Sequence, residues 1–92
     1  MGAPEHAIEA YLQKQCDKRD ILCKKFESPS TRGYPDRILI HHGTVVFVEL
    51  KRPGEKPRKL QMYRIEELIS HGANVEVADT RQKVDNILNK YW

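Results

Sequence analysis

The sequence predicts a single α/β domain over residues 1-92, built in the order α-β-β-β-α-β-α, with a mixed sheet and helices on both faces. Three observations predict this fold class. The chain has 92 residues, a length typical of one domain. Residues 33–51 form two apolar, β-rich runs separated by a short polar break. Helical periodicity recurs before and after these runs, which indicates a strand meander followed by a helical crossover.

The first element predicted is a helix over residues 4–18. Pro4 suits its first turn, and the apolar residues recur at helical spacing, namely Ile8, Leu12 and Cys16, with Tyr11 at the flank. Glu5 projects into this apolar stripe, where a carboxylate is costly without a partner. Glu5 is therefore a candidate for a functional cavity, with a frayed first turn in water as the alternative.

A first strand is predicted over residues 20–27, followed by a loop over residues 28–33. The loop leads directly to Asp36. Its hydroxyl side chains either donate to phosphate groups or serve only as turn residues; they are Ser28, Ser30 and Thr31.

The central hairpin carries the strongest chemical signal. A loop of two residues, His42-Gly43, or of four residues centred on it gives the same register and places Asp36 directly opposite Glu49. Lys51 then projects on the same side as Glu49. Two opposed carboxylates repel unless one is protonated or a cation lies between them, and a divalent metal is the simplest solution. Both faces of the hairpin are apolar, so we expect the sheet to be covered on both sides.

The last third of the chain predicts a helix from Pro57 to Gly72, a strand over residues 74–78 and a final helix capped by Asp79 or Thr80. The apolar stripe of the first of these helices is Met62, Ile65, Leu68 and Ile69. Gln61 faces inward beside this stripe, unless it is only a surface residue near the helix start. The terminal pair Tyr91 and Trp92 is expected to pack on the core or on another subunit.

These residues carry a family resemblance. Asp36 with Glu49-Leu50-Lys51 resembles the signature of the PD-(D/E)xK nuclease superfamily. The longer strings Gly33-Tyr34-Pro35-Asp36-Arg37 and Phe47-Val48-Glu49-Leu50-Lys51, with Gln61, resemble its VRR-NUC (virus-type replication-repair nuclease) branch in the stand-alone phage or bacterial form. The likeness runs from Glu5 to about Leu88. It implies a restriction-endonuclease-like core with the element order given above.

The resemblance also implies an activity and a site. Family members are metal-dependent nucleases, so we expect Mg²⁺ or Mn²⁺ held by Asp36, Glu49 and the backbone carbonyl of Leu50, with Lys51 as a catalytic group. A family glutamate three residues before an apolar position matches Glu5 with Ile8, which favours Glu5 over Glu9 as a further catalytic or metal-binding carboxylate. Gln61 matches a glutamine that faces the active site. Small members of this kind cut branched DNA, notably Holliday junctions, as homodimers.

Two other functions stay open at this stage. One is a non-catalytic DNA-binding module that kept the fold, and the other is a monomeric endonuclease that nicks flaps. The joint presence of Asp36, Glu49 and Lys51 argues against a decayed site. For a homodimer, candidate interface residues are Tyr91, Trp92, Leu60 and Tyr63.

Basic residues gather around the acidic pair although the formal net charge is only +3. Such a distribution favours a phosphate-bearing partner, with a generic solvated surface as the alternative. The candidate DNA-binding residues are Lys25, Ser28, Ser30, Arg32, Arg37, Arg52, Lys56, Arg58, Lys59 and Arg64.

The remaining features exclude other classes. The two cysteines show no metal-ligand spacing and are expected to be free thiols in a reducing compartment. The glycines are isolated turn residues, so no phosphate loop for a nucleotide cofactor is expected. No apolar run reaches the roughly 20 residues of a membrane span, and the first residues do not form a signal peptide. We therefore expect a protein of the cytoplasm, in a bacterial or phage-infected cell.

Overall fold

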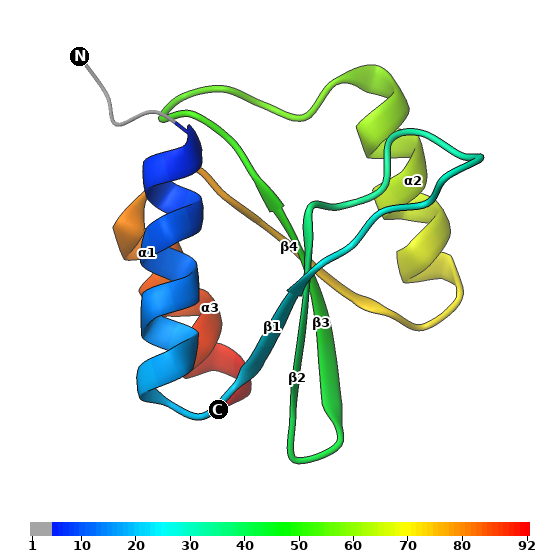
Figure 1. Cartoon of the computed structure of the whole chain (residues 1–92). Coiled ribbons are helices and arrows are strands. Elements are labelled where there is room, and N and C mark those ends of the chain that lie inside the picture. The colour runs from blue at the N-terminus through cyan, green and yellow to red at the C-terminus, as the bar shows by residue number, and fades with distance from the viewer. Residues whose placement is uncertain (1–4) are drawn as a thin grey trace.

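The computed structural model describes residues 5–92, and the predicted element order is confirmed (Figure 1). The predicted helix start at Pro4 lies outside the described residues. The elements are α1 (Glu5–Lys18), β1 (Leu22–Lys25), β2 (Arg37–His41), β3 (Thr44–Leu50), α2 (Lys59–Ser70), β4 (Asn74–Ala78) and α3 (Arg81–Tyr91).

The four strands form one mixed sheet in the order β1-β2-β3-β4. The first three strands run antiparallel to their neighbours, and β4 pairs parallel to β3 after the crossover through α2. Helices α1 and α3 lie together on one side of the sheet, and α2 lies on the other (Figure 1). This arrangement confirms the mixed sheet with helices on both faces.

The hairpin between β2 and β3 has the predicted register. His42 and Gly43 form its two-residue turn with φ of 48° and 79°, the left-handed values that a tight hairpin of this twist requires. The pairs run from His41 opposite Thr44 to Arg37 opposite Val48. The next pair along this register is Asp36 with Glu49, so the acidic pair lies at the end of the ladder.

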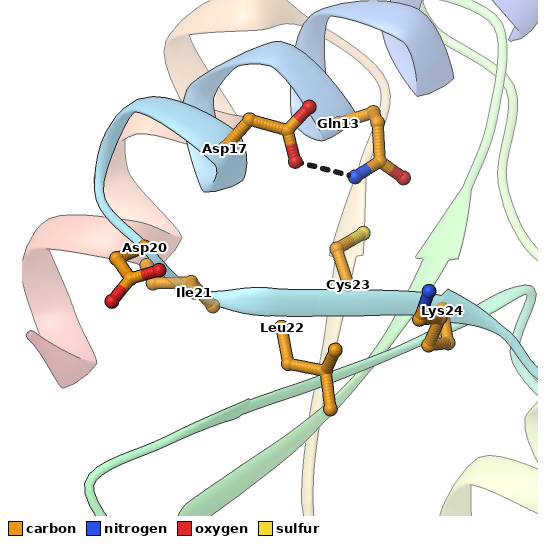
Figure 2. A pocket seen from close by; sticks show the side chains of 7 residues that line it. All are labelled: Gln13, Asp17, Asp20, Ile21, Leu22, Cys23 and Lys24. Atoms are coloured by element: carbon orange, nitrogen blue, oxygen red, sulfur yellow. Dashed lines mark hydrogen bonds between the residues drawn. The ribbon is translucent and has the colours of Figure 1, made fainter.

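The hydrophobic core lies between the sheet and the helices α1 and α3. Alternate side chains of β2 and β3 enter this core, and they are Leu39, Val46, Val48 and Leu50. They meet the predicted stripe of α1 and the buried residues of α3, which are Val84, Ile87 and Leu88. Figure 2 shows the same alternation on β1, where Cys23 points toward α1 and Leu22 points away from it.

The opposite face of the sheet is covered by α2, but only in part. Ile65 is the one residue of α2 that is buried, whereas Met62 and Ile69 are 41% and 52% exposed. On the sheet itself Leu22 is 49% exposed. The reason is size, because one helix about 10 Å wide cannot cover four strands spaced about 4.8 Å apart. Since α2 packs on β4, at one edge of the sheet, this face of β1 at the other edge stays open.

Several predicted boundaries shift by a few residues. The first strand is shorter than residues 20–27, because Asp20 adopts a φ of 58° and ends the turn after α1. Helix α2 begins after the N-cap Arg58, so Pro57 precedes the helix instead of opening it. Of the two predicted caps for α3, Thr80 is the N-cap and accepts a hydrogen bond from the Lys83 amide.

The terminal aromatic residues pack on their own chain. The Trp92 indole donates to the carbonyl oxygen of His41 at 3.0 Å, and the Tyr91 hydroxyl donates to Glu76. Both rings lie against the core. Of the two predicted alternatives for this pair, the structure therefore has the core contact. None of the helices within residues 5–92 is long and apolar enough to cross a bilayer.

Candidate active site

The predicted acidic pair meets at the ends of β2 and β3. The carbonyl oxygen of Asp36 accepts from the Phe26 amide at 2.9 Å, which extends the β1–β2 ladder by one step. The Asp36 carboxylate accepts from the backbone amide of Leu50 at 2.9 Å. The Phe26 amide holds the main chain of Asp36 from the β1 side and the Leu50 amide holds its carboxylate beside β3, so the carboxylate is fixed before any ligand arrives.

Glu49 is the most constrained of the site residues. It is 1% exposed, and among the described residues no group donates a hydrogen bond to either of its carboxylate oxygens. The nearest cation is the Lys51 ammonium, 3.8 Å from Oε2, which is too long for a hydrogen bond. Burial, and after it the neighbouring Asp36, together raise the pKa of Glu49 to about 8. An ionised Glu49 therefore needs a positive partner that the side chains around it supply only in part.

This donor set fits a hard divalent cation. Mg²⁺ is held in proteins by one or two carboxylates together with waters and substrate phosphates, so Asp36 and Glu49 are sufficient side-chain ligands. Within residues 5–92, no three His, Cys, Asp or Glu side chains cluster closely enough to form a closed metal site. Glu5 lies in the first turn of α1, and its charge also raises the pKa of Glu49, so Glu5 is within electrostatic range of the pair.

Lys51 follows β3 and points to the same face as Glu49. Its backbone amide donates to the carbonyl oxygen of Ala78 at 2.9 Å, which extends the β3–β4 pairing past the strand end. Its side chain is only 7% exposed and its ammonium lies 3.8 Å from carboxylates of both Glu49 and Glu55. Glu55 was not predicted from the sequence, although its spacing four residues after Lys51 is an available signal for an ion pair.

Glu5 and Glu9 have different surroundings. Glu9 forms an ion pair with Arg37 at 3.0 Å, and the same guanidinium donates to Gln13. Glu9 is thus engaged in holding α1 against β2. The preference for Glu5 as the functional carboxylate stays a prediction, and this ion pair supports it.

Gln61 has a local role at the start of α2, and its active-site role stays a prediction. Its side-chain oxygen accepts from the backbone amide of Arg58 at 2.8 Å and so caps the start of α2. Among the described contacts, Gln61 has none with the acidic pair or with Lys51 that would place it toward the active site.

Two of the candidate DNA-binding residues are engaged inside the molecule. Arg37 is committed to Glu9 and Gln13, as described above. Arg64 donates to the carbonyl oxygen of Arg32, pairs with Glu67 and lies over the ring of Tyr34. Arg64 therefore anchors the loop before β2 to α2. The other candidates are exposed or half-buried: Lys25, Ser28, Ser30, Arg32, Arg52, Lys56, Arg58 and Lys59.

The loop between β1 and β2 approaches α2 closely. Gly33 has a φ of 92°, and a Cβ there would meet the Leu60 side chain at 2.9 Å, so only glycine fits this contact. The loop encloses an open pocket of about 320 Å³ that includes Ser28, Thr31 and Arg32. Two of the three predicted hydroxyl residues of the loop, Ser28 and Thr31, thus line one hollow with Arg32. A second pocket, shown in Figure 2, lies between α1 and β1 and contains none of the predicted site residues.

Comparisons with known proteins agree on one family. The chain is 39% identical over 85 residues to "Putative nuclease p44" of Acyrthosiphon pisum secondary endosymbiont phage 1, an alignment that covers 91% of the chain and 90% of that protein. A solved structure described as "VRR_NUC domain" superposes with a TM-score of 0.89 at 27% identity, over 98% of this chain and 100% of that one. A second, "VRR_NUC domain protein", has a TM-score of 0.81 at 21% identity, over 99% and 89% respectively, and supports the fold alone. A scan against protein-family profiles finds no match.

Proposed function

Because the chain belongs to the VRR_NUC family of nucleases, we propose that it is a metal-dependent endonuclease that hydrolyses phosphodiester bonds in branched DNA, Holliday junctions above all. One observation carries the proposal. Glu49 is buried, and neither of its carboxylate oxygens accepts a hydrogen bond among the described residues, although Asp36 and Lys51 lie beside it. Stability alone gives a fold no reason to keep such a group, because a buried carboxylate without hydrogen bonds is costly.

Asp36 and Glu49 would hold Mg²⁺ or Mn²⁺, with the Leu50 carbonyl as a further oxygen ligand. When bound, such an ion acts as a Lewis acid on the phosphate and lowers the pKa of its water. Asp36 is preset for this task by the Leu50 amide. Lys51, held between Glu49 and Glu55, presents a fixed positive charge where negative charge develops in the transition state. Glu5 and Gln61 are proposed to orient water at the edge of the site.

DNA would reach the site along the exposed basic residues. Lys56 and Arg58 lie between Lys51 and α2, and Lys59 begins α2. Lys25 and Arg32 precede Asp36 in the chain. Contacts of this kind bind phosphates without reading sequence, which suits an enzyme that recognises the shape of DNA. In the described structure Arg37 and Arg64 have partners within the protein. We therefore assign them to holding the fold together instead of contacting DNA.

A homodimer is proposed for the junction-cutting form. Resolving a junction requires cuts on two opposing strands, whereas one chain offers one acidic site, and two-fold dimers are the commonest assembly. Leu60 and Tyr63 remain interface candidates, since they are 46% and 58% exposed on α2. Tyr91 and Trp92 leave the candidate interface because they pack on their own core.

Cleavage of a labelled four-way junction tests the proposal. The wild-type protein is incubated with the junction in Mg²⁺, in Mn²⁺ and in EDTA, alongside Asp36→Asn. We expect symmetric cuts in either metal, none in EDTA and none with the variant. Junction binding without cleavage in any metal would instead identify a DNA-binding module.

A cruciform plasmid distinguishes the dimer from a monomer. A dimer linearises the plasmid in one binding event, and light scattering then gives twice the 10.7 kDa of one chain. Accumulation of nicked circles by a protein of single-chain mass would contradict the dimer and favour a nicking endonuclease that acts on flaps.

A further inference from the structure

Residues 52–55, which follow Lys51 at the end of β3, form a tight turn that returns to the active site. The Glu55 amide donates to the carbonyl oxygen of Arg52 at 2.9 Å, and Gly54 adopts a φ of 81°. Proline at the second position and a left-handed glycine at the third are the signature of a type II turn. The turn brings the Glu55 carboxylate back to within 3.8 Å of the Lys51 ammonium.

Asp79 holds this turn from the end of β4. Its carboxylate accepts from the Gly54 amide at 2.8 Å, the group that a type II turn otherwise leaves to solvent. Asp79 is 8% exposed, and its other oxygen lies 2.8 Å from the Lys83 ammonium. These contacts lower the pKa of Asp79, with Lys83 and the Gly54 amide as the two leading causes. A buried, charged acceptor on a single backbone amide is a strong contact because charge-assisted hydrogen bonds exceed neutral ones.

The same segment of β4 also fixes the main chain of Lys51. Ala78, the residue before Asp79, accepts from the Lys51 amide. Lys51 is thus held at three points: its amide by Ala78, the turn after it by Asp79, and its ammonium by Glu55 on that turn and by Glu49. Both backbone restraints come from adjacent residues, so any movement of this part of β4 would move the ammonium.

We propose that Asp79 is a positioning residue for cleavage, which acts through the Gly54 amide and Glu55 to hold the Lys51 ammonium over the acidic pair. The proposal rests on the proposed function of Lys51. Asp79 itself touches no part of that acidic pair in the described contacts. A misplacement of about 1 Å at a reacting group can cost about 100-fold in rate, so a support of this kind matters for turnover while leaving the fold intact.

Substitutions at Asp79 separate positioning from stability. Asp79→Ala removes the acceptor for the Gly54 amide, whereas Asp79→Asn keeps an acceptor oxygen in the same place. Lys83→Ala is the matched control, since it removes the ion pair and leaves the acceptor. Each variant is assayed for kcat and KM on the junction in Mg²⁺, for Mg²⁺ affinity by calorimetry, and for thermal unfolding.

We expect Asp79→Ala to lower kcat about tenfold or more, with KM and Mg²⁺ affinity within about twofold of wild type. Asp79→Asn should restore most of kcat, and Lys83→Ala should stay near wild type. A folded Asp79→Ala protein with wild-type kcat would overturn the proposal, as would an Asp79→Asn variant no better than alanine. If Asp79→Ala does not fold, Asp79→Leu replaces it, because leucine fills a similar space without an acceptor for the Gly54 amide, and unchanged kcat in that variant overturns the proposal equally.

Lys51→Ala separates the proposed role of Lys51 from the proposed role of Asp79. Wild-type turnover in Lys51→Ala would refute the proposed role of Lys51, whatever the Asp79 variants do. Loss of turnover in Lys51→Ala with none in Asp79→Ala would leave the proposed function intact and refute only the positioning role.

Discussion

Replacing Glu49 with glutamine should stabilise the metal-free protein at alkaline pH. The pKa of Glu49 is raised from its ordinary value of 4.5 to about 8, first by burial and then by Asp36. The folded protein therefore holds this proton more tightly than the unfolded chain does. Below about pH 4.5 both states are protonated and the group costs nothing. Between about pH 4.5 and 8 the unfolded chain ionises first, so the free energy of unfolding falls as the pH rises.

The size of the effect follows from the pKa. Each pKa unit corresponds to about 1.4 kcal/mol, so ionisation of Glu49 should cost the metal-free fold about 3 kcal/mol between about pH 5 and pH 8. For a domain of this length that loss lowers the melting temperature by about 10–20 °C. Glutamine carries no charge and its amide can donate to Asp36, so Glu49→Gln should lack this loss.

Thermal unfolding followed by circular dichroism in EDTA measures the difference. Wild type and Glu49→Gln are compared at about pH 5 and pH 8, so that contributions from the histidines cancel. We expect similar melting temperatures at the lower pH and a clearly higher one for the variant at the higher pH. Adding Mg²⁺ should close the gap by stabilising only the wild type. Equal pH dependence in the two proteins would refute the reasoning about Glu49.

Three further predictions concern the site and its surroundings. Lys51→Ala should retain Mg²⁺ binding by calorimetry but lose at least about 100-fold in cleavage rate, and wild-type turnover would remove Lys51 from the mechanism. Glu5→Gln should reduce cleavage more than Glu9→Gln, while Glu9→Gln should lower the melting temperature more because it breaks the ion pair with Arg37; the reverse order would reassign the carboxylate on α1. Lys56→Gln should lower the slope of log affinity against log salt by about one phosphate contact, whereas Arg37→Gln should leave that slope unchanged, as filter binding at several salt concentrations would reveal.

The hairpin and its acidic pair could be predicted because their causes are local. Period-2 alternation and a two-residue turn fix which side chains face each other, so Asp36 opposite Glu49 followed from the sequence between residues 33 and 51. The apolar stripes of α1 and α3 could be predicted from the sequence equally well. Their buried residues repeat at helical spacing against a single core.

The errors and omissions concern contacts between segments far apart in the chain. The apolar stripe of α2 predicted burial of Met62 and Ile69, but both are exposed because one helix is too narrow to cover this sheet. The ion pair of Arg37 with Glu9 joins residues 28 positions apart, and the hydrogen bond between Asp79 and Gly54 joins residues 25 positions apart. The spacing of residues gives no signal for such contacts. Basic residues near an acidic site look alike in sequence, whether they face solvent or hold the fold together.

The position of a bound metal ion shows directly whether Asp36 and Glu49 form the metal site. Crystals of the wild-type protein grown with Mn²⁺ and a four-way junction would give an anomalous difference map at the manganese edge. We expect one strong peak between the carboxylates of Asp36 and Glu49, and its loss in Glu49→Gln. A map without a peak at this pair, from crystals in which the junction is bound, would contradict the metal-dependent site.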